Sequence, residues 1–491
     1  MIDKMKLLLI NPYFEGRVYT PSIGLLVLAT TVRRETGIPV RVLEPSLQGY
    51  SFRQVVDIAM DYTHIGVSCY TESRFFSVDL AQAIKGTGRD KVVIFGGPHV
   101  TSLGGAFLKE YPVVDLMIRS DGEKALMGIL RGSDFSTLPG LVYRGTDGRI
   151  IENPVVRDKK VNCLDVDYDF IEDVIANWKD FEVPGRLLKK NHLPIMASMG
   201  CPFQCRFCAA PELGGGLWRG TEPADLVGHI ERLVKERGIG YFRFYDPLFT
   251  ANEKKIQELC KLIIERKLPV NFRVDIRVGT RRDTLELLKK AGCDVVGFGV
   301  ETGSDKLLKI AGKGVSRRQV LETIQVCKDL GFWIIGFFIY FFPNEDEYDR
   351  RQTMDLFKYF DVLNIQFFKI YPGTSYYQEF IAERVMQESF WFDRSIPSDT
   401  YFCKETFPRA EFSINEGMRK IAMSYDLINV KSFGNSFKRN GWKALMTLVY
   451  SIAHYALLRS DTLFNFKNYL ARRGALKPLK RLLALARVNP W

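Results

Sequence analysis

Short apolar runs alternate with amphipathic segments along most of the chain, and this alternation constrains the fold more than any other feature. In the N-terminal third, the apolar runs Lys6 to Asn11, Val40 to Glu44, His64 to Ser68 and Lys91 to Phe95 are separated by segments with a helical period. Strands that alternate with helices predict a parallel, doubly wound sheet whose ligands bind at the carboxyl ends of the strands. We therefore expect a Rossmann-like α/β domain over residues 1–137.

A second alternating series, with longer units, begins at residue 193. The expected strands are Pro194 to Ser198, Tyr241 to Tyr245, Val270 to Asp275, Val295 to Val300, Trp333 to Phe338 and Val362 to Phe368. Six such units predict a (β/α)6 partial barrel over residues 193–382, with site residues at the carboxyl ends of its strands. A hairpin and linker over residues 138–192 should join the two domains, and a basic, mainly helical region should occupy residues 383–491.

Composition excludes several classes of protein. The chain has 491 residues, of which 46% are hydrophobic and 26% charged, as in globular proteins. It contains no run of about 18 apolar residues that would predict a membrane span, and its first residues lack the pattern of a signal peptide. Nine cysteines in such a chain indicate reduced thiols or metal ligands rather than disulfides. These features predict a cytoplasmic protein.

Three of the nine cysteines, Cys201, Cys205 and Cys208, fall within eight residues directly after the first expected barrel strand. Three thiolates in one loop can bind three irons of a four-iron cluster and leave the fourth iron open. A structural zinc site normally needs four ligands, and the neighbourhood offers only His192 as a fourth. The spacing therefore predicts a [4Fe-4S] cluster.

This CxxxCxxC motif, with an aromatic residue at Phe207 and a six-unit barrel, resembles the radical S-adenosylmethionine (SAM) enzymes. The resemblance implies that the three cysteines ligate the cluster, that the open iron chelates SAM, and that one electron cleaves SAM to a 5'-deoxyadenosyl radical. It implies that Phe207 contacts the adenine, and that Asp246, Arg273 and Glu301, on successive strands, contact the carboxylate, ribose or amine of SAM. Solvated strand ends or salt bridges remain the alternative for the three charged residues.

A doubly wound domain that precedes such a barrel is similar to the cobalamin-binding, class B methyltransferase-like branch of the same family. The resemblance implies cobalamin contacts in the loops that follow the strands, at Ser68, Thr71, Glu72, Gly96, Gly97, His99 and Gly122. The segment from Asp61 to Gly66 lacks the DxHxxG spacing of proteins that ligate cobalt through histidine, so His64 is interpreted as structural. For His99, a hydrogen bond within its own turn is the alternative to cobalt ligation.

Methyl transfer to an unactivated carbon is the reaction that this branch implies, because cobalamin can supply a methyl group to a carbon radical. Radical cyclisation or carbon–carbon coupling without methyl transfer is the alternative, and a non-catalytic cofactor-binding sensor is a third class. The aromatic run from Phe338 to Pro343 could line an apolar substrate pocket or simply pack in the core. The resemblance also implies an electron donor such as flavodoxin or ferredoxin.

The net charge of +12 is concentrated at the end of the chain, where residues 431–491 contain twelve basic residues and one acid. Leucine-rich stretches with cations, such as Trp442 to Leu458 and Leu476 to Arg487, favour a membrane interface. A helical cap over the barrel is the alternative, and nucleic acid is not an expected partner. A membrane contact would favour a peripheral location at the inner face of the membrane. The substrate would then be lipid-like, such as an isoprenoid, a hopanoid or a tetrapyrrole.

Overall fold

The computed structural model describes residues 5–12, 21–88, 90–158, 161, 163–164, 166–177, 192–404, 406–407, 410 and 413. The chain divides into two compact units. The first unit comprises residues 1–299, 309–334 and 369–400, and the second comprises residues 300–308, 335–368 and 401–491.

The N-terminal part is a doubly wound α/β domain, as predicted. Its seven-stranded sheet has the order β2-β1-β3-β4-β5-β6-β7, and the first five of these strands are parallel. The strands are β1 (Leu7–Ile10), β2 (Val40–Leu43), β3 (His64–Ser68), β4 (Val92–Gly96), β5 (Leu116–Ile118), β6 (Leu141–Arg144) and β7 (Ile150–Glu152). The chain order reverses between β1 and β3, which is where such sheets bind ligands.

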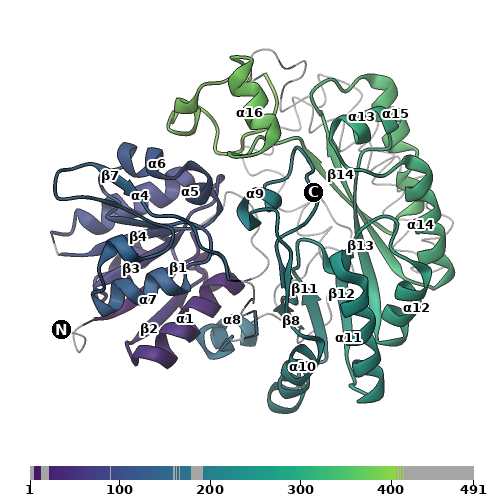
Figure 1. Ribbon diagram of the computed structural model, residues 1–491, viewed down its shortest axis with the longest axis horizontal. Coiled ribbons are helices and arrows are strands. Elements are labelled where there is room, and N and C mark those ends of the chain that lie inside the picture. Colours follow the sequence, from purple (N-terminus) through teal and green to yellow (C-terminus); the bar gives the residue numbers. More distant parts are fainter. Residues whose placement is uncertain are drawn as a thin grey trace, which may run out of the picture. The chain divides into compact units, whose positions relative to one another are not determined.

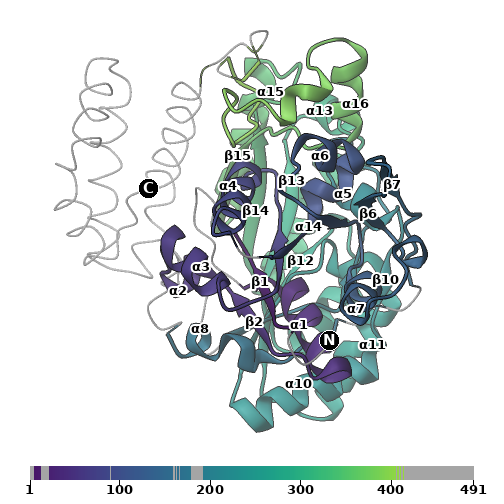
Figure 2. The ribbon, with the colours of Figure 1, turned by 90° about the vertical axis from the view of Figure 1, so that its left-hand side faces the viewer.

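Helices cover both faces of this sheet. Helices α1 and α7 contact each other on one face, and α3 and α4 contact each other on the other face (Figure 2). The helices are α1 (Ile23–Thr36), α2 (Pro45–Gln48), α3 (Phe52–Ala59), α4 (Arg74–Lys85), α5 (Pro98–Leu103), α6 (Gly105–Glu110), α7 (Glu123–Arg131) and α8 (Glu172–Asn177). Local sequence sets their ends: Ser51 and Gln54 form a capping box at the start of α3, and Gly37, with a φ of 69°, ends α1.

The hairpin expected in the linker extends the N-terminal sheet instead. Strand β6 pairs antiparallel with β5, with Leu116 opposite Tyr143, and β7 pairs with β6. The reason is that β5 would otherwise present an unpaired edge, which the hairpin satisfies. The N-terminal sheet therefore continues to Glu152, beyond the expected boundary at residue 137.

The second sheet has six strands in the order β15-β14-β13-β12-β11-β8, which confirms the α/β fold class with a curled parallel sheet. Its strands are β8 (His192–Ile195), β11 (Tyr241–Phe244), β12 (Asn271–Ile276), β13 (Cys293–Glu301), β14 (Trp333–Tyr340) and β15 (Val362–Phe367). Helices alternate with these strands, and α10 to α12 form a layer along the outer face of the sheet (Figure 1). They are α10 (Pro223–Arg237), α11 (Glu253–Glu265), α12 (Arg282–Lys290), α13 (Asp305–Ile310), α14 (Arg317–Asp329), α15 (Glu347–Met354) and α16 (Ser375–Ala382).

The aromatic run from Phe338 to Pro343, which includes the end of β14, packs into the core of the second unit. Phe338 contacts the rings of Phe357 and Phe360, and Phe341 contacts Phe367. Phe338, Phe341 and Phe342 are between 1% and 3% exposed. Of the two alternatives for this run, the structure therefore supports core packing rather than a pocket wall.

No helix in the described part of the chain is long and apolar enough to cross a membrane. The basic stretches Trp442 to Leu458 and Leu476 to Arg487 lie outside the described residues.

Candidate functional site

A short hairpin connects the first strand of the half-barrel to the loop that contains the three cysteines. Strand β9 (Ser198–Met199) pairs antiparallel with β10 (Arg219–Gly220), and the loop with the three cysteines lies between them. At the start of this loop Gly200 has a φ of 78°, and a Cβ atom there would lie 2.0 Å from the carbonyl oxygen of Leu217. Only glycine fits this close approach, so the residue before Cys201 fixes how the loop leaves the hairpin.

The three motif cysteines differ from the other six in their exposure. Cys201, Cys205 and Cys208 are free and partly exposed, whereas the remaining six cysteines are buried. Burial raises the pKa of the Cys260 thiol to about 12, which keeps such a thiol neutral and unreactive. Only the motif cysteines are therefore accessible as thiolate ligands.

An arginine lies beside the motif cysteines. The Arg277 guanidinium hydrogen-bonds to the Cys205 side chain and stacks 3.5 Å from the centre of the Phe203 ring. Within the described residues, no three histidine, cysteine or acidic side chains converge on one metal ion. A four-iron cluster does not require such convergence, because each thiolate binds a different iron. The donor set thus fits a cluster better than a single metal ion.

Asp246 lies at the carboxyl end of β11 and organises the segment that leads to the cysteines. It is 5% exposed, and its carboxylate accepts hydrogen bonds from the Ala197 backbone N–H (3.1 Å) and the Ser198 hydroxyl (2.5 Å). Burial raises its pKa to about 6 although these hydrogen bonds oppose the rise. The expected strand from Pro194 to Ser198 is divided into β8, which ends at Ile195, and β9, which begins at Ser198. In this structure Asp246 positions the segment that leads into the cysteine loop.

The other expected SAM contacts lie at three places. Phe207 is half-buried within the cysteine loop, and Arg273 lies on β12 with 7% exposure. Glu301 ends β13 in the second unit and is 8% exposed, with a φ of 66°. A positive φ is uncommon for a non-glycine residue, and such strain is concentrated at functional sites.

The expected cobalamin contacts lie at or directly after the carboxyl ends of β3, β4 and β5, along one edge of the N-terminal sheet. They are Ser68, Thr71, Glu72, Gly96, Gly97, His99 and Gly122. Gly97 has a φ of 98°, and a Cβ atom there would lie 2.8 Å from the backbone oxygen of Cys69. Only glycine fits this position, so Gly97 allows the loop after β4 to pack closely against the backbone that follows β3.

Two of these side chains are engaged with other protein groups. The His99 ring is 0% exposed, its Nδ1 lies 3.1 Å from the Thr71 hydroxyl, and it packs edge-on against Phe107 and Trp391. Protein groups cover this imidazole completely, so the internal hydrogen bond is the role that the structure shows for His99. Glu72 accepts hydrogen bonds from the Lys369 ammonium (3.1 Å) and the Tyr371 hydroxyl (3.0 Å).

Sequence reasoning did not single out a buried polar cluster at the ends of β1 and β2. Glu44 is 1% exposed and accepts hydrogen bonds from the Asn11 amide (2.7 Å) and the Ser22 backbone N–H (2.6 Å). Burial raises the pKa of Glu44 to about 7. A polar residue directly after each apolar run was the available signal.

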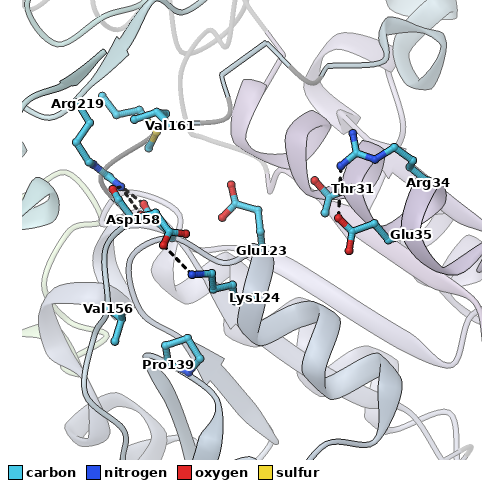
Figure 3. Close-up of a pocket in the computed structure, with 12 residues that line it drawn as sticks. Thr31, Arg34, Glu35, Glu123, Lys124, Pro139, Val156, Asp158, Val161 and Arg219 are labelled. Carbon is cyan, nitrogen blue, oxygen red and sulfur yellow. Dashed lines mark hydrogen bonds and ion pairs between the residues drawn. The ribbon is translucent and has the colours of Figure 1, made fainter. Parts of the chain in front are cut away.

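A second feature that the sequence did not reveal joins the two domains within the first unit. Arg219, in the cysteine hairpin, is 6% exposed and binds both carboxylate oxygens of Asp121, at 2.5 and 3.1 Å. Asp121 precedes the expected cobalamin contact Gly122. The pair lines a pocket into which the Glu123 carboxylate points (Figure 3). The hairpin of the cysteine loop is therefore tied to the loop after β5.

The chain is similar to proteins that combine two known domains. A family model described as the radical SAM superfamily matches residues 195–357, and one described as a B12 binding domain matches residues 15–130. An uncharacterized methyltransferase of Pyrococcus horikoshii is 28% identical over 411 residues, which cover 79% of this chain and 85% of that protein.

Two further similarities concern a cyclase and a solved structure. The anaerobic magnesium-protoporphyrin IX monomethyl ester cyclase of Rubrivivax gelatinosus is 27% identical over 64% of this chain, and the match spans only 58% of that enzyme. The solved structure of the cobalamin-dependent SAM radical enzyme OxsB, with aqua-cobalamin and SAM bound, has a TM-score of 0.69 and 14% sequence identity. The match covers 96% of this chain and 76% of OxsB. At this identity, the likeness to OxsB concerns the fold alone.

Proposed function

Because the chain belongs to the cobalamin-binding branch of the radical SAM enzymes, we propose that it transfers a methyl group to an unactivated carbon of an apolar substrate. Its cofactors are a [4Fe-4S] cluster, SAM and cobalamin. When bound, the cluster and SAM supply a 5'-deoxyadenosyl radical that removes a hydrogen atom, and cobalamin supplies the methyl group. The protein has to position the substrate between them and exclude water.

The observation that carries the proposal is the loop of three accessible cysteines, tied by Arg219 and Asp121 to the edge of a B12 binding domain. In this proposal Cys201, Cys205 and Cys208 hold the cluster. The SAM contacts are Phe207, Asp246, Arg273 and Glu301. The sheet edge at Gly96, Gly97 and Gly122, with Ser68, Thr71 and Glu72 beside it, receives cobalamin.

The composition of the chain end supports a lipid-like substrate, such as an isoprenoid, a hopanoid or a tetrapyrrole. Residues 431–491 carry most of the net positive charge and are rich in leucine, a combination that binds anionic membrane surfaces. We place the protein in the cytoplasm, peripheral to the inner face of the membrane, with flavodoxin or ferredoxin as electron donor. Flotation of the intact chain with vesicles tests this location: binding should require phosphatidylglycerol, and equal flotation with neutral vesicles would contradict it.

Radical cyclisation is the second candidate, and the similarity to the Rubrivivax gelatinosus cyclase favours it. The two candidates differ in the fate of the methyl group of SAM. Methyl transfer forms a labelled product from methyl-labelled SAM together with 5'-deoxyadenosine. Cyclisation forms 5'-deoxyadenosine with no label in the product.

Metal analysis of the anaerobically reconstituted protein is the first test. After addition of hydroxocobalamin and desalting, we expect about four irons, four sulfides and one cobalt per chain. The Cys205→Ala variant should lose the cluster, whereas the matched control Cys260→Ala, at a buried thiol, should retain it. Four irons without cobalt would refute the methyl-transfer proposal and favour the cyclisation alternative.

A further inference from the structure

Two arginines lie side by side on neighbouring strands of the half-barrel. Strands β11 and β12 are parallel, and their register places Arg243 directly opposite Arg273. Successive residues of a strand point to opposite faces of the sheet. The neighbouring Phe244 packs against Phe249 and Phe272, so the two arginines lie on the face of the sheet opposite to these rings.

The structure provides little compensation for these two charges. Arg273 is 7% exposed, and among the described residues its one polar contact is a 3.5 Å approach to Asp275. Arg243 forms no hydrogen bond or ion pair with any described residue, and its guanidinium lies 4.2 Å from the centre of the Tyr245 ring. The Nε atoms of both arginines are buried without a partner among these residues.

Neighbouring groups do not neutralise the excess charge. The two guanidinium groups repel each other, and burial together with this repulsion lowers the pKa of Arg243. One carboxylate, Asp275, stands beside two cations, and the nearby Asp294 binds the Tyr241 hydroxyl at 3.0 Å. An arginine stays charged in proteins, and an unpaired buried charge is strongly unfavourable. Such a pair is therefore expected to bind an anion.

We propose that Arg243 and Arg273 bind an oxyanion of the substrate, a carboxylate or a phosphate, inside the half-barrel. The planar fork of a guanidinium suits bidentate binding of either group. The proposal rests on the proposed function and extends it, because the apolar substrate then also carries an acidic group.

SAM is the competing source of an oxyanion at this position. It carries a single carboxylate and a sulfonium cation, so one SAM molecule cannot neutralise both arginines. Arg273 can contact SAM and still share a substrate oxyanion with Arg243. Arg243, which forms no hydrogen bond with a described residue, distinguishes this pair from a single SAM contact.

Thermal unfolding of the reconstituted holoenzyme with inorganic phosphate or acetate as the probe tests the pair. At constant ionic strength, both anions should raise the unfolding temperature of the wild type, because a ligand stabilises the state that binds it. Arg243→Met should abolish this rise and, without anion, unfold at the same or a higher temperature than the wild type, because it removes an uncompensated charge. The control Arg318→Met, at a side chain that is 84% exposed, should keep the anion response. An unchanged anion response in Arg243→Met would overturn the proposal.

The affinity for SAM separates the two sources of the oxyanion. In equilibrium dialysis, Arg243→Met should change the dissociation constant of SAM by less than about threefold, whereas loss of a charged hydrogen bond weakens binding tenfold or more. A tenfold loss of SAM affinity would assign the pair to the SAM carboxylate and overturn the substrate assignment. Iron and cobalt analysis of the same samples shows separately whether the proposed function fails.

Discussion

Replacement of Glu44 by glutamine should remove most of the pH dependence that this residue gives to the stability of the N-terminal domain. Burial raises the pKa of Glu44 from 4.5 to about 7, and a rise of about 2.5 corresponds to about 3 kcal/mol at 1.36 kcal/mol per pH unit. The folded state binds the proton more tightly than the unfolded state. The contribution of the Glu44 proton to the free energy of unfolding is therefore fully present below pH 4.5. It falls as the pH rises towards 7, and above pH 7 the free energy no longer changes because of this group.

The Glu44→Gln side chain can keep both hydrogen bonds. Its oxygen can accept from the Ser22 N–H, and the Asn11 amide can flip so that Asn11 Oδ1, which has no partner in the described structure, accepts from the new amide. The variant should therefore match the wild type near pH 4.5 and exceed its stability by about 3 kcal/mol above pH 7.

Hydrogen exchange of the ligand-free protein measures this difference. The free energy of opening is obtained from the β1 peptide between pH 4.5 and 8, with correction for the intrinsic exchange rate. The control Glu35→Gln replaces a side chain that is 39% exposed and should show a much smaller pH-dependent difference from the wild type. A difference between Glu44→Gln and the wild type that does not change with pH would refute the reasoning.

Three further predictions concern the cysteine loop and its link to the N-terminal domain. Cys205→Ala should abolish the formation of 5'-deoxyadenosine from SAM under reducing conditions, and normal formation would exclude a cysteine-ligated cluster as its source. Asp246→Ala removes the acceptor for two hydrogen bonds and should lower the iron content per chain at least twofold, measured by iron analysis at equal protein concentration. Arg219→Met leaves the Asp121 carboxylate, 23% exposed, without its main partner and should lower the free energy of unfolding by about 3 kcal/mol. Urea unfolding of Arg219→Met, of Asp121→Asn and of the double variant measures the interaction free energy between the two side chains. If the losses in free energy of unfolding of the two single variants simply add in the double variant, a direct interaction is contradicted.

The tie between Arg219 and Asp121 matters for the proposed reaction because methyl transfer requires two cofactors at a fixed separation. Arg219 belongs to the hairpin that carries the three motif cysteines, the proposed cluster ligands, and Asp121 precedes an expected cobalamin contact. A buried, bidentate ion pair fixes both distance and orientation more strictly than a single hydrogen bond does. A lysine has no planar fork and could not form this bidentate pair.

The sequence by itself determined the features that depend on local spacing. The alternation of apolar runs and amphipathic segments predicted two α/β domains, and the strand order of both sheets agrees with it. The three cysteines predicted a cluster site because ligands in one loop stay close in any fold. Capping residues such as Ser51 fixed helix ends for the same reason, since their partners lie three residues away.

Only the tertiary structure decided which distant residues meet. The Arg243 and Arg273 side chains are 30 positions apart in the sequence, and only the register of β11 and β12 brings them together. The hairpin of β6 and β7 joins the N-terminal sheet because β5 exposes an edge, which no local pattern reports. Asp246 has the position that the sequence assigned, but its hydrogen bonds to Ala197 and Ser198 follow from the pairing of β8 with β11. Local spacing sets the elements, whereas strand order and register set the chemistry between them.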